Sequence, residues 1–124
     1  RTMDYIKKYK INTNGINFIP LMGYYDFIKL QKESFFIISD SGTAQEESAL
    51  IQKPVIVPRD FTERPQSYHN NCSYGLNVNN RNTSWNNSIN WINKYINNDL
   101  NINISWLGNG KTSSKIIDII SQRI

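Results

Sequence analysis

An apolar segment that ends in a turn of small residues is the feature that most constrains the fold of this chain. Phe35-Phe36-Ile37-Ile38 favours a strand, and Asp40-Ser41-Gly42-Thr43-Ala44-Gln45-Glu46-Glu47 has the composition of a turn that opens a helix. The first N–H groups of a helix lack intrahelical partners and lie at the positive end of the helix dipole. Small residues let an anion approach those groups closely. The sequence therefore predicts a phosphate-binding pocket, with Ser41, Gly42 and Thr43 as its ligands.

A second strand leads into a loop that is rich in arginine. Lys53-Pro54-Val55-Ile56-Val57 is followed by Arg59-Asp60-Phe61-Thr62-Glu63-Arg64-Pro65. Arginine matches the geometry of phosphate, and a proline directly after Arg64 favours the first position of a new helix. Arg64 is therefore the preferred anion contact of this loop. Arg59 and Asp60 are expected to pair with each other or to brace the loop, and a surface ion-pair loop is the simpler alternative.

The rest of the chain alternates helical and extended patterns. We expect helices over residues 2–10, 24–32, 43–51, 65–72 and 84–96 and a last helix capped by Thr112 or Ser113, and strands over residues 17–19, 35–39, 54–57 and 76–78. This alternation predicts an α/β fold, a Rossmann-like parallel sheet with helices on both faces. The strand over residues 35–39 has almost no polar side chain, which predicts burial on both faces. Ligands bind beyond the carboxyl ends of such strands, so the two loops would face one ligand if their strands are neighbours.

The two acidic residues of the motif are expected to play different roles. Glu46 and Glu47 are adjacent, hence about 100° apart around a helix, and cannot both face one ligand. Glu47 lies four residues after Thr43 and on its face, so it is the candidate to accept hydrogen bonds from a ribose. Glu46 is expected to cap the helix or to face solvent. The alternative is an ordinary strand-to-helix turn, with Ser41 as N-cap or a capping box from Thr43 to Glu46.

Composition narrows the classes of function. The 124 residues suffice for one domain, and the net charge of +4 comes without a stripe of basic and aromatic residues, so nucleic-acid binding is not expected. No apolar run approaches the roughly 20 residues of a membrane span, and no signal peptide is visible.

The single cysteine, Cys72, cannot form an internal disulfide, which suits a reducing, cytoplasmic location. We expect it to be a small buried residue. The only histidine, His69, is expected to be structural or exposed. No metal-ligand cluster or nucleophile motif is present in the sequence, so neither a metal nor a cofactor is expected.

In their order along the chain, these motifs resemble the C-terminal domain of UDP-N-acetylglucosamine 2-epimerases. The family pattern is D-S-G-G-x-Q-E-E, then K-P-V, then R-D-x-T-E-R-P, and residues 40–47, 53–55 and 59–65 follow it. Residues 23–27 resemble a segment just upstream in the family, and residues 108–113 resemble its G-D-G-K-A-S turn before the final helix. The resemblance spans nearly the whole chain.

The resemblance implies that residues 1–124 are the nucleotide (UDP)-binding C-terminal domain of a GT-B-like, two-domain enzyme whose N-terminal catalytic domain lies upstream. Carried over by position, Ser41–Thr43 hold the diphosphate, Glu47 holds the ribose, Arg64 lies on the UDP side of the cleft, and Phe27 lies near the uracil. Thr43 replaces the usual second glycine of the motif, which leaves the sugar open.

The resemblance also implies the chemistry of the parent enzyme. In the family, UDP is eliminated from UDP-N-acetylglucosamine to give 2-acetamidoglucal, and it adds back with C2 inverted to give UDP-N-acetylmannosamine for polysaccharide biosynthesis. The acids and the histidine credited with these steps lie upstream, so this chain alone is expected to be inactive and the full-length enzyme to be a homodimer without a membrane partner. Two alternatives remain: a related GT-B sugar-nucleotide enzyme (a hydrolysing epimerase or a glycosyltransferase), or a stand-alone nucleotide-binding domain.

Overall fold

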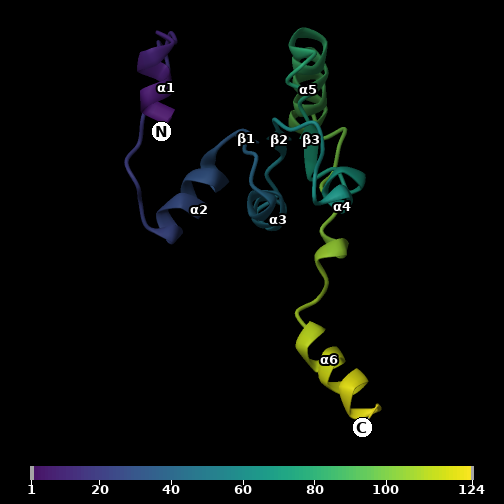
Figure 1. Ribbon diagram of the computed structural model, residues 1–124. Coiled ribbons are helices and arrows are strands. Elements are labelled where there is room, and N and C mark those ends of the chain that lie inside the picture. Colours follow the sequence, from purple (N-terminus) through teal and green to yellow (C-terminus); the bar gives the residue numbers. More distant parts are fainter. Residues whose placement is uncertain (1, 124) are drawn as a thin grey trace.

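The computed structural model describes residues 2–123, apart from the side chain of Arg81, and contains a small parallel sheet in the middle of the chain (Figure 1). Its elements in chain order are α1 (Thr2–Lys8), α2 (Tyr24–Glu33), β1 (Ile37–Ile38), α3 (Gly42–Leu50), β2 (Val55–Val57), α4 (Pro65–His69), β3 (Ser73–Gly75), α5 (Arg81–Ile96), the 3-10 helix η1 (Ser105–Leu107) and α6 (Thr112–Ser121). Every predicted helix is present, although α4 ends three residues before the expected position 72.

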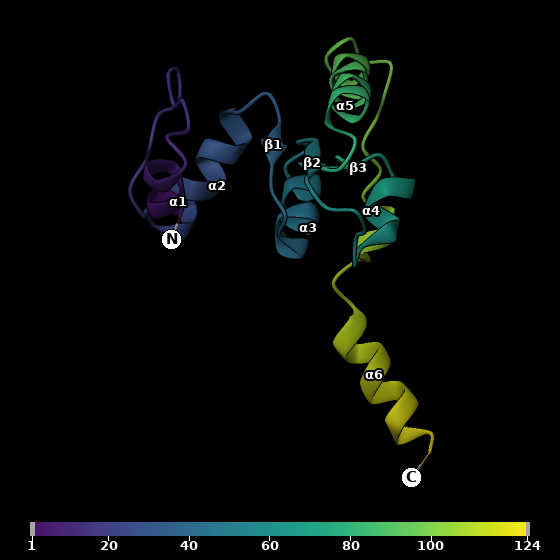
Figure 2. The same ribbon diagram turned by 45° about the horizontal axis from the view of Figure 1, so that its top comes forward.

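The sheet has three parallel strands in the order β1-β2-β3. Ile37 lies beside Val55, and Val55 lies beside Ser73. Figures 1 and 2 show α3 and α4, which connect the strands, on one side of the sheet and α5 on the other. The predicted Rossmann-like α/β fold is therefore confirmed. Because β1 and β2 are neighbours, the loops that follow them leave the same edge of the sheet.

The core lies at the central strand and behind β3. Val55, Ile56 and Val57 are fully buried, as a strand between two neighbours requires. Behind them, Ala49 and Cys72 pack with Ile102 in a cluster that Tyr95, Trp106 and Leu107 cover. Cys72 is thus the small buried residue that the sequence predicts.

Two predicted strands are wrong. Residues 17–19 are extended but unpaired, and Phe18 and Ile19 are exposed. This segment runs between α1 and α2, away from the sheet, and so finds no neighbouring strand (Figure 1). The strand expected over residues 76–78 lies at Ser73–Gly75 instead. Its position is set by pairing with β2, which overrides the weak intrinsic strand preference of serine and glycine.

The expected burial of both faces of the first strand is also wrong. β1 has only two residues, Phe35 before it is 77% exposed, and Ile38 within it is 52% exposed. Because β1 is at the edge of the sheet and pairs only with β2, part of its apolar surface remains in contact with solvent.

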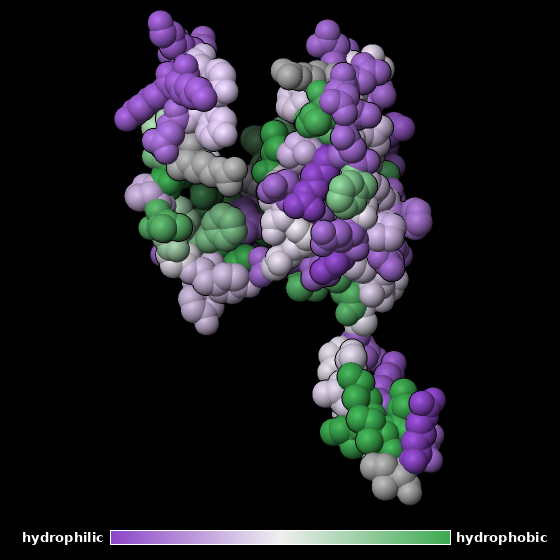
Figure 3. All heavy atoms as spheres, viewed as in Figure 1, coloured by the Kyte–Doolittle hydropathy of each residue, from purple (hydrophilic) through white to green (hydrophobic). Residues whose placement is uncertain are grey.

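Helix α6 extends away from the sheet, beyond Gly108 and Gly110, which have φ angles of +82° and +76° (Figures 1 and 2). The expected capping by Thr112 or Ser113 is wrong, since Lys111 is the N-cap and makes no side-chain capping bond. The apolar side of α6 is exposed (Figure 3), and its isoleucines are Ile116, Ile117, Ile119 and Ile120. Within residues 2–123, no helix has the length and apolar character needed to cross a bilayer.

Candidate functional site

The turn between β1 and α3 exposes small polar residues at the carboxyl edge of the sheet. Ser41 is the N-cap of α3, yet its side chain makes no capping bond, and its N–H donates to Ser39 Oγ at 3.2 Å. Within the described residues, the hydroxyls of Ser41 and Thr43 take part in no hydrogen bond, and both residues are exposed. The alternative that Ser41 is the N-cap is therefore confirmed by its position, although its hydroxyl makes no capping bond. These groups are instead accessible to a ligand.

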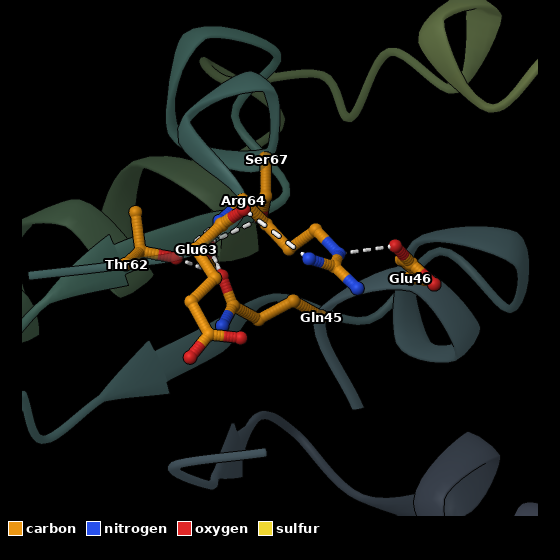
Figure 4. Close-up of polar contacts among 7 residues, drawn as sticks. Gln45, Glu46, Thr62, Glu63, Arg64 and Ser67 are labelled. Atoms are coloured by element: carbon orange, nitrogen blue, oxygen red, sulfur yellow. Dashed lines mark hydrogen bonds and ion pairs between the residues drawn. The ribbon is translucent and has the colours of Figure 1, made fainter. Parts of the chain in front are cut away.

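Arg64 lies directly across from this turn. A methyl group added at Gly42 would lie 3.9 Å from both Cζ and Nη2 of Arg64. Arg64 Nε donates to Glu46 Oε1 at 2.5 Å, and Nη1 donates to the carbonyl oxygen of Glu63 at 3.2 Å. Figure 4 shows the guanidinium reaching from its loop towards Glu46 on α3. The structure thus brings the two predicted motifs together.

The two adjacent acids of α3 face different partners, as helix geometry predicts. Glu46 pairs with Arg64, so the expectation that it caps the helix or faces solvent is wrong. The loop after β2 approaches α3 on the side where Glu46 lies, which the sequence alone does not reveal. Glu47 faces α2, where the hydroxyl of Tyr24 donates to its Oε1 at 3.1 Å. This hydrogen bond, together with the charge of Glu47, raises the pKa of Tyr24.

A buried amide that the sequence analysis did not single out connects α3 to the Arg64 loop. Gln45 is 2% exposed, and its Oε1 accepts hydrogen bonds from Thr62 Oγ1 at 2.9 Å and from Ser73 Oγ at 3.3 Å. Thr62 Oγ1 in turn accepts the N–H of Arg64 at 3.0 Å. A threonine two residues before the arginine favours this local turn, so the hydrogen bond of Thr62 to the N–H of Arg64 could have been predicted from the sequence. The role of Gln45 could not have been predicted in this way, because its partners come from distant parts of the chain.

The first arginine of the loop braces two segments. Nη2 of Arg59 lies 3.9 Å from Oδ2 of Asp40, in the turn after β1. Its Nη1 lies 3.9 Å from Oε1 of Glu63 in its own loop. Asp60 accepts a hydrogen bond from Asn79 at 3.2 Å, so the predicted pair of Arg59 with Asp60 is wrong. The alternative that Arg59 braces the loop is confirmed.

Phe27 lies beside an apolar hollow of about 560 Å³ on the first turns of α2. The hollow is lined by Ile19, Pro20, Leu21, Met22, Tyr24, Phe27 and Leu30. Tyr24 both lines it and bonds Glu47, so the hollow adjoins the side of α3 that Glu47 occupies. His69, at the end of α4, is exposed, as expected.

Comparison with known proteins gives this arrangement a context. The chain is 42% identical over 62 residues to the UDP-N-acetylglucosamine 2-epimerase of Campylobacter jejuni, and 44% identical over 59 residues to that of Salmonella borreze. These segments cover 50% and 48% of the chain but only 16% of each relative.

Solved structures extend the similarity to nearly the whole chain. A crystal structure of the Methanocaldococcus jannaschii UDP-GlcNAc 2-epimerase in complex with UDP-GlcNAc and UDP matches with a TM-score of 0.75 and 28% identity, over 98% of this chain and 33% of that one. The Neisseria meningitidis enzyme bound to UDP-GlcNAc matches with a TM-score of 0.60 and 27% identity, over 98% of this chain and 39% of that one. The chain thus spans about a third of the length of these structures.

The sequence profile of one family, UDP-N-acetylglucosamine 2-epimerase, matches residues 1–121. Because this match covers almost every residue and agrees with the fold and the motif order, the chain belongs to the UDP-N-acetylglucosamine 2-epimerase family.

Proposed function

We propose that this chain binds the UDP part of a UDP-sugar, as the nucleotide-binding C-terminal domain of a UDP-N-acetylglucosamine 2-epimerase. The observation that carries the proposal is the closeness of the guanidinium of Arg64 to the helix start, where a Cβ added at Gly42 would lie 3.9 Å from Cζ and Nη2. It brings a cation and free helical N–H groups to the carboxyl edge of two neighbouring parallel strands, where α/β proteins bind ligands.

The diphosphate would lie at the start of α3 and beside Arg64, within reach of both. The first N–H groups of α3 have no intrahelical acceptor, and the hydroxyls of Ser41 and Thr43 flank them. Nη2 of Arg64 faces the same turn from the opposite side. Helix dipole, backbone donors and a charged donor all favour an anion of this kind.

The nucleoside would extend from there towards α2. Glu47 lies one turn further along α3, and Tyr24 occupies its Oε1, so Oε2 is available to a ribose hydroxyl. Phe27 follows Tyr24 by three residues, on the same face of α2, and its ring borders the apolar hollow. An aromatic ring next to an apolar hollow suits the face of a uracil.

In the elimination of UDP and its return to the sugar, this chain would hold the leaving group. Negative charge grows on the diphosphate as the bond to the sugar breaks, and Arg64 with the start of α3 would stabilise that charge. The proton transfers would come from an N-terminal catalytic domain outside this chain, so we expect no epimerisation by residues 1–124 alone. We further propose that the complete enzyme is a cytoplasmic homodimer.

Calorimetric titration with UDP tests the proposal. We expect weak binding, in the millimolar range or somewhat tighter, because the proposed N-terminal domain would supply the other wall of the cleft. Arg64→Ala should weaken the affinity at least tenfold. Arg59→Ala is the matched control, since Arg59 belongs to the same loop and has a similar exposure but pairs with Asp40 and Glu63. Absence of binding at millimolar UDP, or equal affinities of the Arg64→Ala variant and the unmodified chain, would refute the proposed site.

A further inference from the structure

We propose that Gln45 and Glu46, two adjacent residues of α3, position Arg64 for the anion. Helix α3 would then have two roles, supplying N–H donors at its start and orienting the arginine that faces them. The inference deepens the proposed function and rests on it.

Gln45 fixes the backbone of the Arg64 loop through Thr62. The hydroxyl of Thr62 donates to Gln45 Oε1 and accepts from the N–H of Arg64, so a single side chain joins the buried amide to the peptide that carries the arginine. Ser73 on β3 donates to the same Oε1 and also bonds Ser67 on α4. Because a buried polar group without a partner is costly, this network resists displacement of the loop.

Glu46 fixes the side chain. An arginine has five N–H donors in a rigid fork, and two of its nitrogens are already engaged, Nε with Glu46 and Nη1 with the carbonyl of Glu63. Nη2 remains on the side of Gly42, where the anion would lie. The guanidinium is therefore oriented before the ligand arrives, which lowers the entropic cost of binding.

The charge of Glu46 provides a way to separate positioning from electrostatics. A carboxylate beside an anion site repels the anion, so a purely electrostatic role would make Glu46→Gln bind UDP more tightly than the unmodified chain. A positioning role needs only an oxygen that accepts from Nε, which the amide of glutamine retains. Glu46→Ala removes that acceptor and leaves Arg64 free to swing away.

The experiment measures UDP affinity by calorimetry, with thermal unfolding of each variant alongside. We expect Glu46→Ala and Thr62→Val to weaken binding about tenfold. Glu46→Gln and Thr62→Ser, which keep the acceptor and the hydroxyl, should remain within threefold of the unmodified chain. Ser88→Ala is the matched control, because Ser88 is fully buried on α5 and its hydroxyl donates to the carbonyl oxygen of Ser84, outside the network around Arg64.

A double-mutant cycle shows whether the effect passes through Arg64. In a chain that already carries Arg64→Ala, adding Glu46→Ala or Thr62→Val should cause no further loss of affinity. Two outcomes would overturn the positioning role alone. One is a tenfold loss of UDP affinity that persists in the Arg64→Ala background. The other is normal UDP affinity of the single Glu46→Ala and Thr62→Val variants when Arg64→Ala itself weakens binding. Failure of the unmodified chain to bind UDP would overturn the proposed function and this inference with it.

Discussion

Gly42 and the guanidinium of Arg64 lie close together, because a Cβ at Gly42 would be 3.9 Å from Cζ and from Nη2. That distance is an ordinary van der Waals contact, so the folded chain tolerates a side chain there. A phosphate bound at the helix start beside the arginine, as proposed, would compete with that side chain for space. Under this proposal, folding and ligand binding place opposite demands on this position.

Gly42→Ala should consequently leave the fold intact and impair binding. Gly42 is not among the glycines with positive φ, so alanine fits its backbone and should stabilise the chain by about 0.4–1 kcal/mol through the unfolded state. UDP affinity should fall at least tenfold. Thermal unfolding and calorimetry on the same sample check both effects, and a variant that binds UDP normally would contradict the placement of the phosphate.

The hydrogen bond between Tyr24 and Glu47 should be visible as a pH effect. Hydrogen bonding to Glu47 and its negative charge raise the pKa of Tyr24 above its usual 10.0. The neutral phenol is the donor, so the bond is fully present below pH 10 and is lost as the pH rises through the raised pKa. NMR titration of ring-labelled tyrosine measures the pKa of Tyr24, and the Tyr24→Phe variant assigns its signal. Glu47→Gln should lower that pKa towards 10.0.

Gly75 and Tyr68 should be coupled in stability. A methyl group at Gly75 would lie 3.1 Å from the Tyr68 hydroxyl, which is buried and has no hydrogen-bond partner within the described residues. Gly75→Ala should therefore lower the free energy of unfolding by about 1–2 kcal/mol. Tyr68→Phe removes an unsatisfied hydroxyl, so it should be neutral or slightly stabilising and should recover most of that loss in the double variant. Urea unfolding checks this, and strictly additive losses would show that the contact is absent.

Cys72 should be inert towards thiol reagents in the folded chain. Its side chain is fully buried, and burial raises the pKa of its thiol, although the hydrogen bond from Trp106 opposes this shift. Since only the thiolate reacts, a colorimetric disulfide reagent should label Cys72 at a rate set by unfolding. Rapid labelling without denaturant, at the rate seen in concentrated urea, would show that the cluster around Cys72 opens readily.

Sequence reasoning was most successful where the signal is local. The strand, the small-residue turn and the helix that follows occupy consecutive residues, and each part favours the next. The approach of Arg64 to Gly42 followed from one further rule, that the carboxyl ends of neighbouring parallel strands share an edge. The roles towards a nucleotide stay predictions for all six residues: Ser41, Gly42, Thr43, Glu47, Arg64 and Phe27.

Relations that depend on packing between distant segments were not predictable in the same way. Whether Glu46 meets solvent or an arginine depends on how α3 is rotated against a loop 18 residues later. The position of β3 depends on its pairing with β2, whereas its own residues favour a strand less than Leu76 and Val78 do. The exposure of Ile38 depends on β1 being the edge of the sheet.

The division of partners around α3 has a consequence for how this turn can vary in evolution. One residue inserted or deleted within the first turn of α3, between Gly42 and Gln45, would rotate the residues that follow by about 100° relative to the helix start. Glu46 would lose its arginine, and Gln45 would turn its amide away from Thr62. Most surface connections accept changes of length. Inside this turn mutation can exchange side chains, while an insertion or a deletion would displace Gln45 and Glu46 together.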